Sequence, residues 1–302
     1  MAGEFEFLSW IGKRQRASEL TRVGVGDDLA VLNWPSGDLL LVGVDQVLDQ
    51  VHFDSTIHAP RFIGRKAMNR NLSDCAAMGC LPAAAVATVA LPAGCGLEYA
   101  QELYLGMEEA AGAFDCAIVG GDTGTWGGKL AMTVTILGRS GGIEPITRGG
   151  AKPGDFVFVS GPLGGSILGR HMTFEPRVTL GRKLAEEHFP SAMIDLSDGL
   201  SRDLAHICRQ SGVGAIVEAD AVPIHPDATK LAKDGRAAIL HAMNDGEDYE
   251  LLLTSAGAGH PGLIRIGQIT ADAAILLRTP GSSPGQAATM SPLEPRAWEH
   301  RL

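Results

Sequence analysis

Aspartate is the residue in this sequence whose type and spacing point most directly to chemistry. Four aspartate motifs lie where an apolar run meets a turn, and a fifth lies inside a predicted helix. The motifs are Gly26-Asp27-Asp28, Val44-Asp45, Gly120-Gly121-Asp122-Thr123, Ile194-Asp195-Leu196-Ser197-Asp198-Gly199 and, in the helix, Asn71-Leu72-Ser73-Asp74. Mg²⁺ prefers oxygen ligands and is usually held by a few carboxylates together with substrate phosphates, and neighbouring glycines let backbone N–H groups approach anionic oxygens. The pattern therefore predicts a site for magnesium and phosphate.

Each aspartate taken alone has a simpler explanation, because Asp beside Gly is common in turns and helix caps. Asp198 could cap a predicted helix at 199–210, and Asp28 could be a solvated neighbour of Asp27. Asp74 fits this explanation less well, because a buried carboxylate in the middle of a helix is costly without a cation. As a set, the aspartates indicate clustered cations better than independent caps.

Composition and charge narrow the possible functions. The 302 residues include 25 Lys and Arg against 35 Asp and Glu, a net charge of −10. Binding to nucleic acid depends on clustered basic residues, so we expect no nucleic-acid partner. Hydrophobic residues make up 45% and charged residues 20% of the chain, which is typical of a globular protein of about two domains.

The cysteines and the apolar segments bear on the compartment. The five cysteines include no C-x-x-C pair, which argues against a disulfide framework or a zinc site and favours reduced thiols. The acidic amino terminus does not resemble a secretion signal. The longest apolar stretch, 81–93, is too short to cross a bilayer and contains two prolines. We expect a cytoplasmic protein with no membrane association.

Hydrophobic periodicity divides the chain into two α/β (α+β) halves. In the first half we predict strands at 39–44, 84–91, 116–119 and 130–137 and helices at 61–78 and 97–114. After a turn-rich segment we predict strands at 156–159, 215–218, 249–254 and 264–269 and helices at 178–188 and 199–210. We therefore expect an N-terminal domain, 1–140, and a C-terminal domain, 141–302. The segment 279–296 should be an extended connection.

Familiar nucleotide and nucleophile motifs are absent or lack their structural context. The sequence has no G-x-x-x-x-G-K-[ST], so a P-loop is excluded. Residues 257–262 fit G-x-G-x-x-G, but Pro261 and a strand-like segment stand where a Rossmann helix must begin. Residues 138–142 fit G-x-S-x-G without a following helix, so we interpret them as a turn.

The aspartate motifs and their neighbours resemble thiamine-monophosphate kinases, within the superfamily of aminoimidazole ribonucleotide synthetase. The matching segments, in family order, are 24–32, 51–54, 63–67, 71–79, 119–123, 148–155, 176–178, 193–200, 246–252 and 298–300. The resemblance implies a two-domain aminoimidazole ribonucleotide synthetase-like fold, with an N-terminal domain that forms a homodimer and ATP bound between the domains. It also implies ATP-dependent phosphorylation of thiamine monophosphate to thiamine diphosphate with several Mg²⁺ ions.

The resemblance assigns roles to individual positions. The implied magnesium ligands are Asp27, Asp45, Asp74, Asp122, Asp195 and Asp198, of which Asp74, Asp122 and Asp198 are the implied catalytic residues. The implied ATP contacts are Tyr104, Gly121, Asp122, Arg148 and Ser197, and the implied substrate contacts are His52, Glu247 and Trp298.

Several of these assignments compete with structural roles. His52 could be a core histidine held by backbone, Tyr104 could be part of the helix core, and Arg148 could be a solvated loop cation. Glu247 lies among acids that could be exposed edge charges. Trp298 could anchor the tail, although an aromatic face also attracts a positively charged ring.

The sequence departs from the family pattern at a few positions. Gly43 and Val44 stand where the family usually has hydroxyl residues, so one metal site could lose a side-chain ligand. Gly165 replaces a common acid, and Asp245 replaces a common glycine. Two alternatives therefore stay open: an enzyme of the same superfamily that acts on another small molecule, and a non-catalytic, metal-binding dimeric scaffold.

Overall fold

The computed structural model describes residues 10–14, 18–23, 31–281 and 286–294. Three residues singled out above, Asp27, Asp28 and Trp298, lie outside these ranges. The chain forms two compact units. Unit 1 comprises residues up to Cys75, Cys80–Ile143 and Met172–Val178, and unit 2 comprises Ala76–Gly79, Glu144–His171 and the chain from Thr179 onward.

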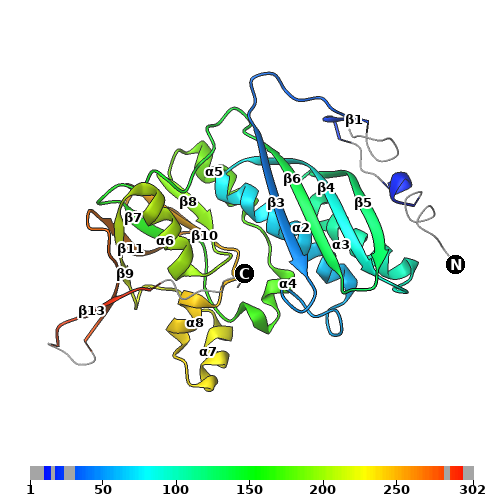
Figure 1. Ribbon diagram of the computed structural model, residues 1–302. Coiled ribbons are helices and arrows are strands. Elements are labelled where there is room, and N and C mark those ends of the chain that lie inside the picture. Colours follow the sequence, from blue (N-terminus) through cyan, green and yellow to red (C-terminus); the bar gives the residue numbers. More distant parts are fainter. Residues whose placement is uncertain (1–9, 15–17, 24–30, 282–285, 295–302) are drawn as a thin grey trace. The chain divides into compact units, whose positions relative to one another are not determined.

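Unit 1 is built on a four-stranded sheet with the order β3-β6-β4-β5. Its strands are β3 (Leu40–Leu48), β4 (Leu81–Pro92), β5 (Ala117–Trp126) and β6 (Ala131–Arg139). The β4–β5 pair is parallel and the other pairs are antiparallel. A short pair, β1 (Thr21–Val23) and β2 (Val31–Leu32), precedes the sheet. Figure 1 shows the four strands of the sheet, β3, β6, β4 and β5, side by side.

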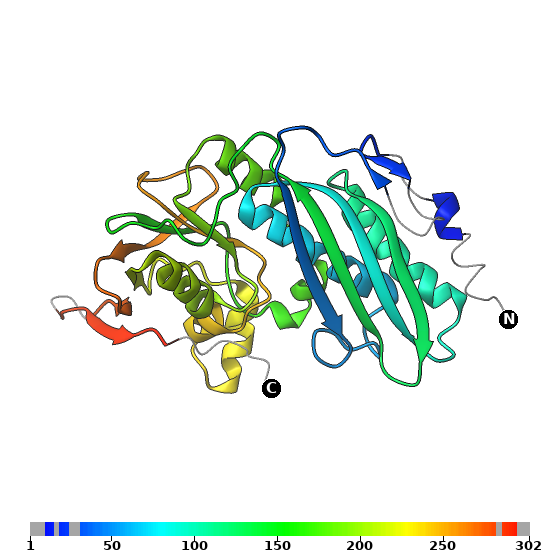
Figure 2. The same ribbon diagram turned by 45° about the horizontal axis from the view of Figure 1, so that its top comes forward.

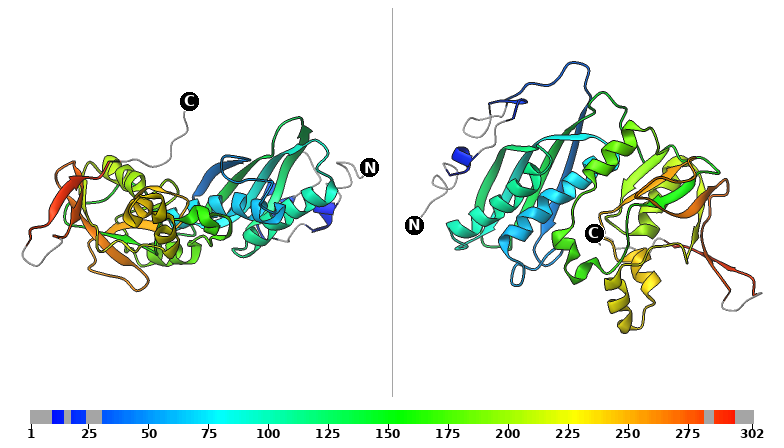
Figure 3. Two further views of the ribbon diagram at one scale, coloured as in Figure 1. Left: turned by 90° about the horizontal axis from the view of Figure 1, so that it is seen from below. Right: turned by 180° about the vertical axis from the view of Figure 1, so that it is seen from behind.

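Two helices, α2 (Pro60–Met78) and α3 (Leu97–Gly112), cover one face of this sheet (Figure 3). They pack closely because glycines stand at the contact: a Cβ on Gly64 would lie 1.9 Å from the Leu103 carbonyl oxygen, and a Cβ on Gly106 would lie 1.9 Å from the Arg61 carbonyl oxygen. The strands present alternate side chains to the helices, as Met132, Val134 and Ile136 of β6 are buried. The helix-facing side of the sheet thus forms the core of unit 1.

Unit 2 contains a seven-stranded sheet with the order β13-β12-β9-β11-β7-β10-β8. Its strands are β7 (Phe156–Val159), β8 (Ala192–Asp195), β9 (Gly214–Glu218), β10 (Leu251–Ser255), β11 (Ile264–Thr270), β12 (Ile275–Thr279) and β13 (Thr289–Pro292). The helices are α5 (Val178–Glu186), α6 (Leu200–Ser211), α7 (Pro226–Leu231) and α8 (Ala238–Asn244), with 3₁₀ turns at Ser166–Leu168 and Ala232–Asp234. A single helical turn, α4 (Arg170–Thr173), lies where the chain passes between the units. Helices α7 and α8, drawn in yellow, lie side by side in Figure 2.

Helix α6 provides most of the helical part of the unit 2 core. Leu200, Leu204 and Ile207, spaced three and four residues apart, are fully buried and belong to one cluster with Val157 and Val159 of β7. Full burial of each such side chain stabilises the fold by about 1.5–3 kcal/mol. The apolar face of α6 therefore fixes the position of its amino-terminal turn, where the candidate site of unit 2 lies.

The predicted α/β architecture is confirmed, and most predicted elements exist with shifted ends. The prediction at 156–159 coincides with β7, whereas the strand predicted at 39–44 continues to Leu48. The predicted extended tail contains β13, which pairs with β12. Helices α7 and α8 were not predicted, because at six and seven residues they are too short for a clear 3.6-residue period. Within the described ranges, the structure contains no helix that is long and apolar enough to cross a membrane.

Candidate functional site

Asp45 and Asp74 lie along the seam between β3 and α2. Asp45 occupies the helix-facing side of β3, where its Oδ1 lies 3.5 Å from Nη2 of Arg70 on α2. Asp74 follows Arg70 by one helical turn and is half-buried. Its Oδ2 lies 3.7 Å from the position of a Cβ on Gly43. The structure thus brings these two predicted metal ligands to the same side of the sheet.

The two unusual positions on β3 differ in direction. Gly43 faces α2 and Asp74, whereas the Val44 side chain is 62% exposed on the other face of the sheet. Strand alternation requires this difference. A hydroxyl at position 43 would lie beside Asp74, and a hydroxyl at position 44 would not.

His52 lies in the loop after β3 and is held through its backbone and its ring. Its carbonyl accepts a hydrogen bond from Nζ of the fully buried Lys66, and its N–H donates to the Leu48 carbonyl at 2.9 Å. The Leu48 N–H donates to Nδ1 of His52 at 3.0 Å. A neutral His52 ring must therefore carry its proton on Nε2. Backbone groups hold this histidine, as the alternative of a structural role predicted. The same contacts fix the neutral ring as an Nε2–H donor.

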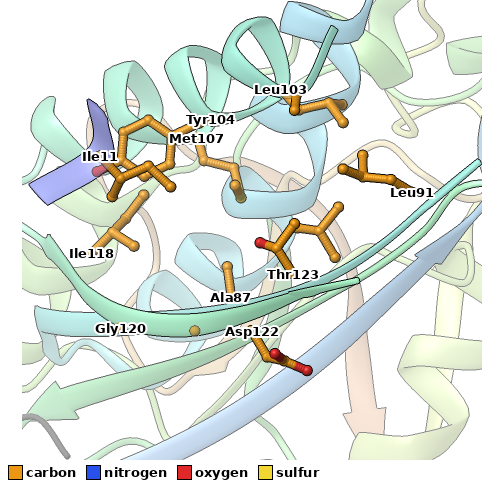
Figure 4. Close-up of a pocket in the computed structure, with 13 residues that line it drawn as sticks. Ile11, Ala87, Leu91, Leu103, Tyr104, Met107, Ile118, Gly120, Asp122 and Thr123 are labelled. Carbon is orange, nitrogen blue, oxygen red and sulfur yellow. The ribbon is translucent and has the colours of Figure 1, made fainter. Parts of the chain in front are cut away.

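Tyr104 and Gly121 line a pocket between α3 and strands β4 and β5 (Figure 4), with an empty volume of about 550 Å³ that includes open solvent. Burial raises the pKa of Tyr104 to about 12, so the phenol stays protonated. Its ring packs edge-on against Trp10 at 5.6 Å between centroids. A Cβ on Gly121 would lie 2.0 Å from the Ala87 carbonyl oxygen, so only glycine fits there.

Asp122 also lines this pocket, but its carboxylate projects away from Tyr104 and Thr123. In Figure 4 its carboxylate lies on the opposite side of β5 from Thr123. Its partner on β4, Thr88, is likewise exposed on the face away from the helices. Strands β6 and β4 separate β5 from β3, a distance of about 14 Å at ordinary strand spacing. A single chain therefore does not bring Asp122 together with Asp45 and Asp74.

In unit 2, Asp195 ends β8 and Asp198 follows in the turn before α6. The N-cap of α6 is Gly199, so the interpretation of Asp198 as a cap is wrong. The capping role belongs to Asp203, whose Oδ2 accepts hydrogen bonds from the N–H groups of Asp198 at 3.2 Å and Gly199 at 3.0 Å. The Asp198 carboxylate is thus left out of the cap.

The sequence analysis missed Asp203 and His206. Asp203 is only 1% exposed, and burial, reinforced by the charges of Asp195 and Asp198, raises its pKa to about 8. Ligand atoms of Asp198, Asp203 and His206 lie within 4.8 Å of one another. The spacing of Asp203 and His206 could have indicated this cluster, since residues three apart in a helix lie on one face.

Glu247, Ser197 and Arg148 complete the candidate residues of unit 2. The N–H of Glu247 donates to the Ser197 carbonyl at 2.8 Å, and Ser166 Oγ donates to the Glu247 carbonyl at 2.7 Å. Arg148 is exposed, and its charge adds to burial in lowering the pKa of His206. These interactions place Glu247 against the Asp195–Gly199 turn and Arg148 near His206 of α6.

The acids around Glu247 are not exposed edge charges. Asp248 and Glu250 are 3% and 4% exposed. Asp248 forms an ion pair with Arg170 at 2.8 Å and accepts the Gly164 N–H, and Glu250 accepts a hydrogen bond from Ser160. The alternative prediction, that the acids of this segment are exposed edge charges, is therefore wrong for Asp248 and Glu250.

Gly165 and Asp245, the two residues of unit 2 that differ from the family pattern, contact each other. The Gly165 N–H donates to Oδ2 of Asp245 at 3.3 Å. Gly165 has a φ of 74°, and a Cβ there would lie 2.4 Å from the Ala228 nitrogen. A side chain at position 165 would clash with Ala228 in this chain, and Asp245 supplies a carboxylate to the same place from the other loop.

Comparison with known proteins defines the class and then the family. Residues 26–140 match the model of the AIR synthase related protein, N-terminal domain. The chain is 44% identical over 261 residues to the thiamine-monophosphate kinase of Rhodopirellula baltica, covering 84% of this chain and 82% of that protein. The crystal structure of thiamine-monophosphate kinase from Stenotrophomonas maltophilia K279a is similar with a TM-score of 0.79 and 31% identity, covering 91% of this chain and 96% of that one.

A further solved structure, AaThiL complexed with AMPPCP and TMP, is similar with a TM-score of 0.74 and 27% identity, covering 96% of this chain and 97% of that one. The fold is therefore that of the AIR synthase related proteins. Within this class, the chain belongs to the thiamine-monophosphate kinase family. The resemblance noted in the sequence is confirmed.

The buried Asp203 leads to a prediction about pH. Its pKa is raised from 3.8 to about 8 on folding, so the folded state binds this proton more tightly than the unfolded state and loses stability as the pH rises between these values. Asp203→Asn removes this loss. In EDTA, the melting temperature at pH 8.5 minus that at pH 5.5 should therefore be roughly 3 °C or more higher for Asp203→Asn than for the unmodified protein. Differential scanning calorimetry at the two pH values measures this.

The exposed Asp272 provides the control. Asp272→Asn should shift the two melting temperatures equally, because solvent screens its charge in both states. If Asp203→Asn also shifts the melting temperatures at pH 5.5 and pH 8.5 equally, the pKa of Asp203 is not raised by folding.

Proposed function

We propose that this protein is an ATP-dependent kinase that phosphorylates thiamine monophosphate to thiamine diphosphate. The observation that carries the proposal is similarity to thiamine-monophosphate kinases across most of the chain. The complex of AaThiL with AMPPCP, an ATP analogue, and TMP supports the pair of substrates. None of the residues that the structure describes specifically favours another small molecule or a non-catalytic scaffold.

The chemistry of this reaction matches the acidic character of the site. Donor and acceptor are both phosphates, so transfer depends on positioning and on neutralising charge. Burial, reinforced by the neighbouring charges of Asp195 and Asp198, raises the pKa of Asp203 to about 8, which fits a site that is completed by cations. Carboxylate oxygens suit Mg²⁺, which would supply charge neutralisation at the transferring phosphoryl group.

We assign the magnesium ligands to both units. Asp45 and Asp74 would serve in unit 1, Asp122 at the β5 edge, and Asp195 and Asp198 in unit 2. Asp27, outside the described residues, keeps this role as a proposal from resemblance.

The other candidate residues receive roles that match their surroundings. The pocket of Tyr104 and Gly121 suits part of ATP, because its other walls are largely apolar. Exposed Arg148 suits a phosphate group, and Ser197 lies in the turn with Asp198. We assign His52 to the substrate, as the resemblance implies. We also assign Glu247 and Trp298 to the substrate, the latter from resemblance alone.

We further propose a homodimer. Val42 and Val44 are 63% and 62% exposed on the sheet face that the helices do not cover. Asp122 lies on that face at the edge opposite β3. A second copy whose β5 edge packs against this β3 would cover the valines and bring its Asp122 next to the strand that carries Asp45. The five free cysteines support a reducing compartment, the cytoplasm.

The primary test is direct product formation. Purified protein with ATP, Mg²⁺ and thiamine monophosphate should give equal amounts of ADP and thiamine diphosphate, measured by chromatography and ³¹P NMR. Asp198→Asn should lower the rate by roughly 100-fold or more, because a ligand for charge neutralisation is lost. Thiamine in place of its monophosphate is the control acceptor. Absence of thiamine diphosphate from folded, ATP-binding protein would refute the proposed reaction.

The shared site predicts complementation between two inactive variants. Asp74→Asn and Asp122→Asn should each be inactive alone, but a heterodimer of the two contains one site with both aspartates intact. Co-expression with two different tags and double purification should give a heterodimer with about half the specific activity of the unmodified dimer.

A doubly tagged Asp74→Asn homodimer is the control and should be inactive. An inactive heterodimer would place Asp74 and Asp122 in the same subunit's site, and failure to co-purify would exclude the dimer.

A further inference from the structure

Arg70 lies beside Asp45, a position assigned above to magnesium. Its Nη2 is 3.5 Å from Oδ1 of Asp45, and the side chains of the two residues are only 15% and 29% exposed. An arginine side chain cannot lose its proton in a protein. A permanent positive charge therefore stands at one oxygen of this carboxylate.

Arg70 belongs to a stripe of charged residues on α2 that faces β3. Lys66, Arg70 and Asp74 follow each other at intervals of four residues, which places them on one helix face. Lys66 binds the His52 carbonyl at the end of β3, and Asp74 lies near Gly43 in its first half. Arg70 stands between these contacts and therefore reaches the middle of the strand, at Asp45.

A divalent ion on the same oxygen would compete with this contact. Mg²⁺ binds carboxylate oxygens at about 2.1 Å, so an ion on Oδ1 would lie within about 5.6 Å of Nη2, the sum of the two distances. At that separation, in a partly buried place, the two positive charges repel each other strongly. The arginine and the metal ion are alternative partners for Asp45.

Gly43 agrees with this interpretation. It faces α2 like Asp45, but it offers no side-chain oxygen to a metal ion. This stretch of β3 thus offers no side-chain ligand at Gly43, and Arg70 of α2 stands beside its Asp45.

We propose that Arg70 is a built-in cation that takes the place of one divalent ion at Asp45. This inference rests on the proposed function in assigning Asp45 to the phosphate site, and it replaces the role of magnesium ligand that the resemblance gives to Asp45. The Arg70 guanidinium acts through Asp45 as a positioning residue, and it supplies positive charge at this carboxylate at any magnesium concentration.

The test counts bound Mn²⁺ by electron paramagnetic resonance of the full-length protein with MnCl₂ alone, without nucleotide. Asp45→Asn should bind as many ions per chain as the unmodified protein. Arg70→Met should bind about one ion more, because Asp45 then becomes available to metal. The double variant Asp45→Asn/Arg70→Met should lose that additional ion.

Arg65→Met is the matched control, because Arg65 lies on the same helix but pairs with Glu175 at 3.9 Å. It should leave the ion count unchanged. Arg70→Gln is a second variant that retains hydrogen-bonding capacity, and circular dichroism identifies any variant that has lost its fold.

Two results would overturn the inference. Asp45→Asn alone could lower the ion count, which would make Asp45 a metal ligand in the presence of Arg70. Alternatively, folded Arg70→Met and Arg70→Gln could both keep the original count, which would show that Arg70 excludes no ion. Both results are independent of turnover, so failure of the proposed kinase activity is distinguishable from failure of this inference.

Discussion

Repulsion among carboxylates is the constraint on which the rest of this structure depends. The turn before α6 and the seam between α2 and β3 hold acids in partly or fully buried places, where like charges cannot coexist without compensation. The clearest sign is Asp203, because burial and then the charges of Asp195 and Asp198 raise its pKa to about 8. A protein that keeps such an arrangement must provide positive charge.

The chain compensates its acids in more than one way. Backbone N–H groups of the α6 turn bind Asp203. Arginines bind others: Arg170 pairs with the buried Asp248, and Arg70 lies beside Asp45. For the remaining acids, Mg²⁺ and substrate are the natural partners in a kinase that must bring two phosphates together. The fold supports this by fixing the positions of the acids, through the buried face of α6 and through the glycines that let α2 and α3 approach closely.

Much of the site follows from local patterns in the sequence. Asp74 was expected inside a helix and Asp195 at the end of an apolar run, and both lie there, because helical and strand periods are local properties. Strand alternation also predicts that the Val44 side chain points away from Asp45, to the exposed face of β3. Asp203 was missed because one acid in the first turn of a helix looks ordinary until its burial is known. The contact between Gly165 and Asp245 joins residues 80 positions apart, and no local pattern reports such a pair.

Cations are the condition for nucleotide binding at a site with so many acids, and calorimetry of ATP binding tests this most directly. Isothermal titration of the purified protein with ATP should give saturable binding in excess Mg²⁺ and no measurable heat of binding in EDTA, because the acids repel the triphosphate when no cation neutralises them. Equal ATP affinity with and without Mg²⁺ would contradict the account, since the acids would then play no part in holding the nucleotide.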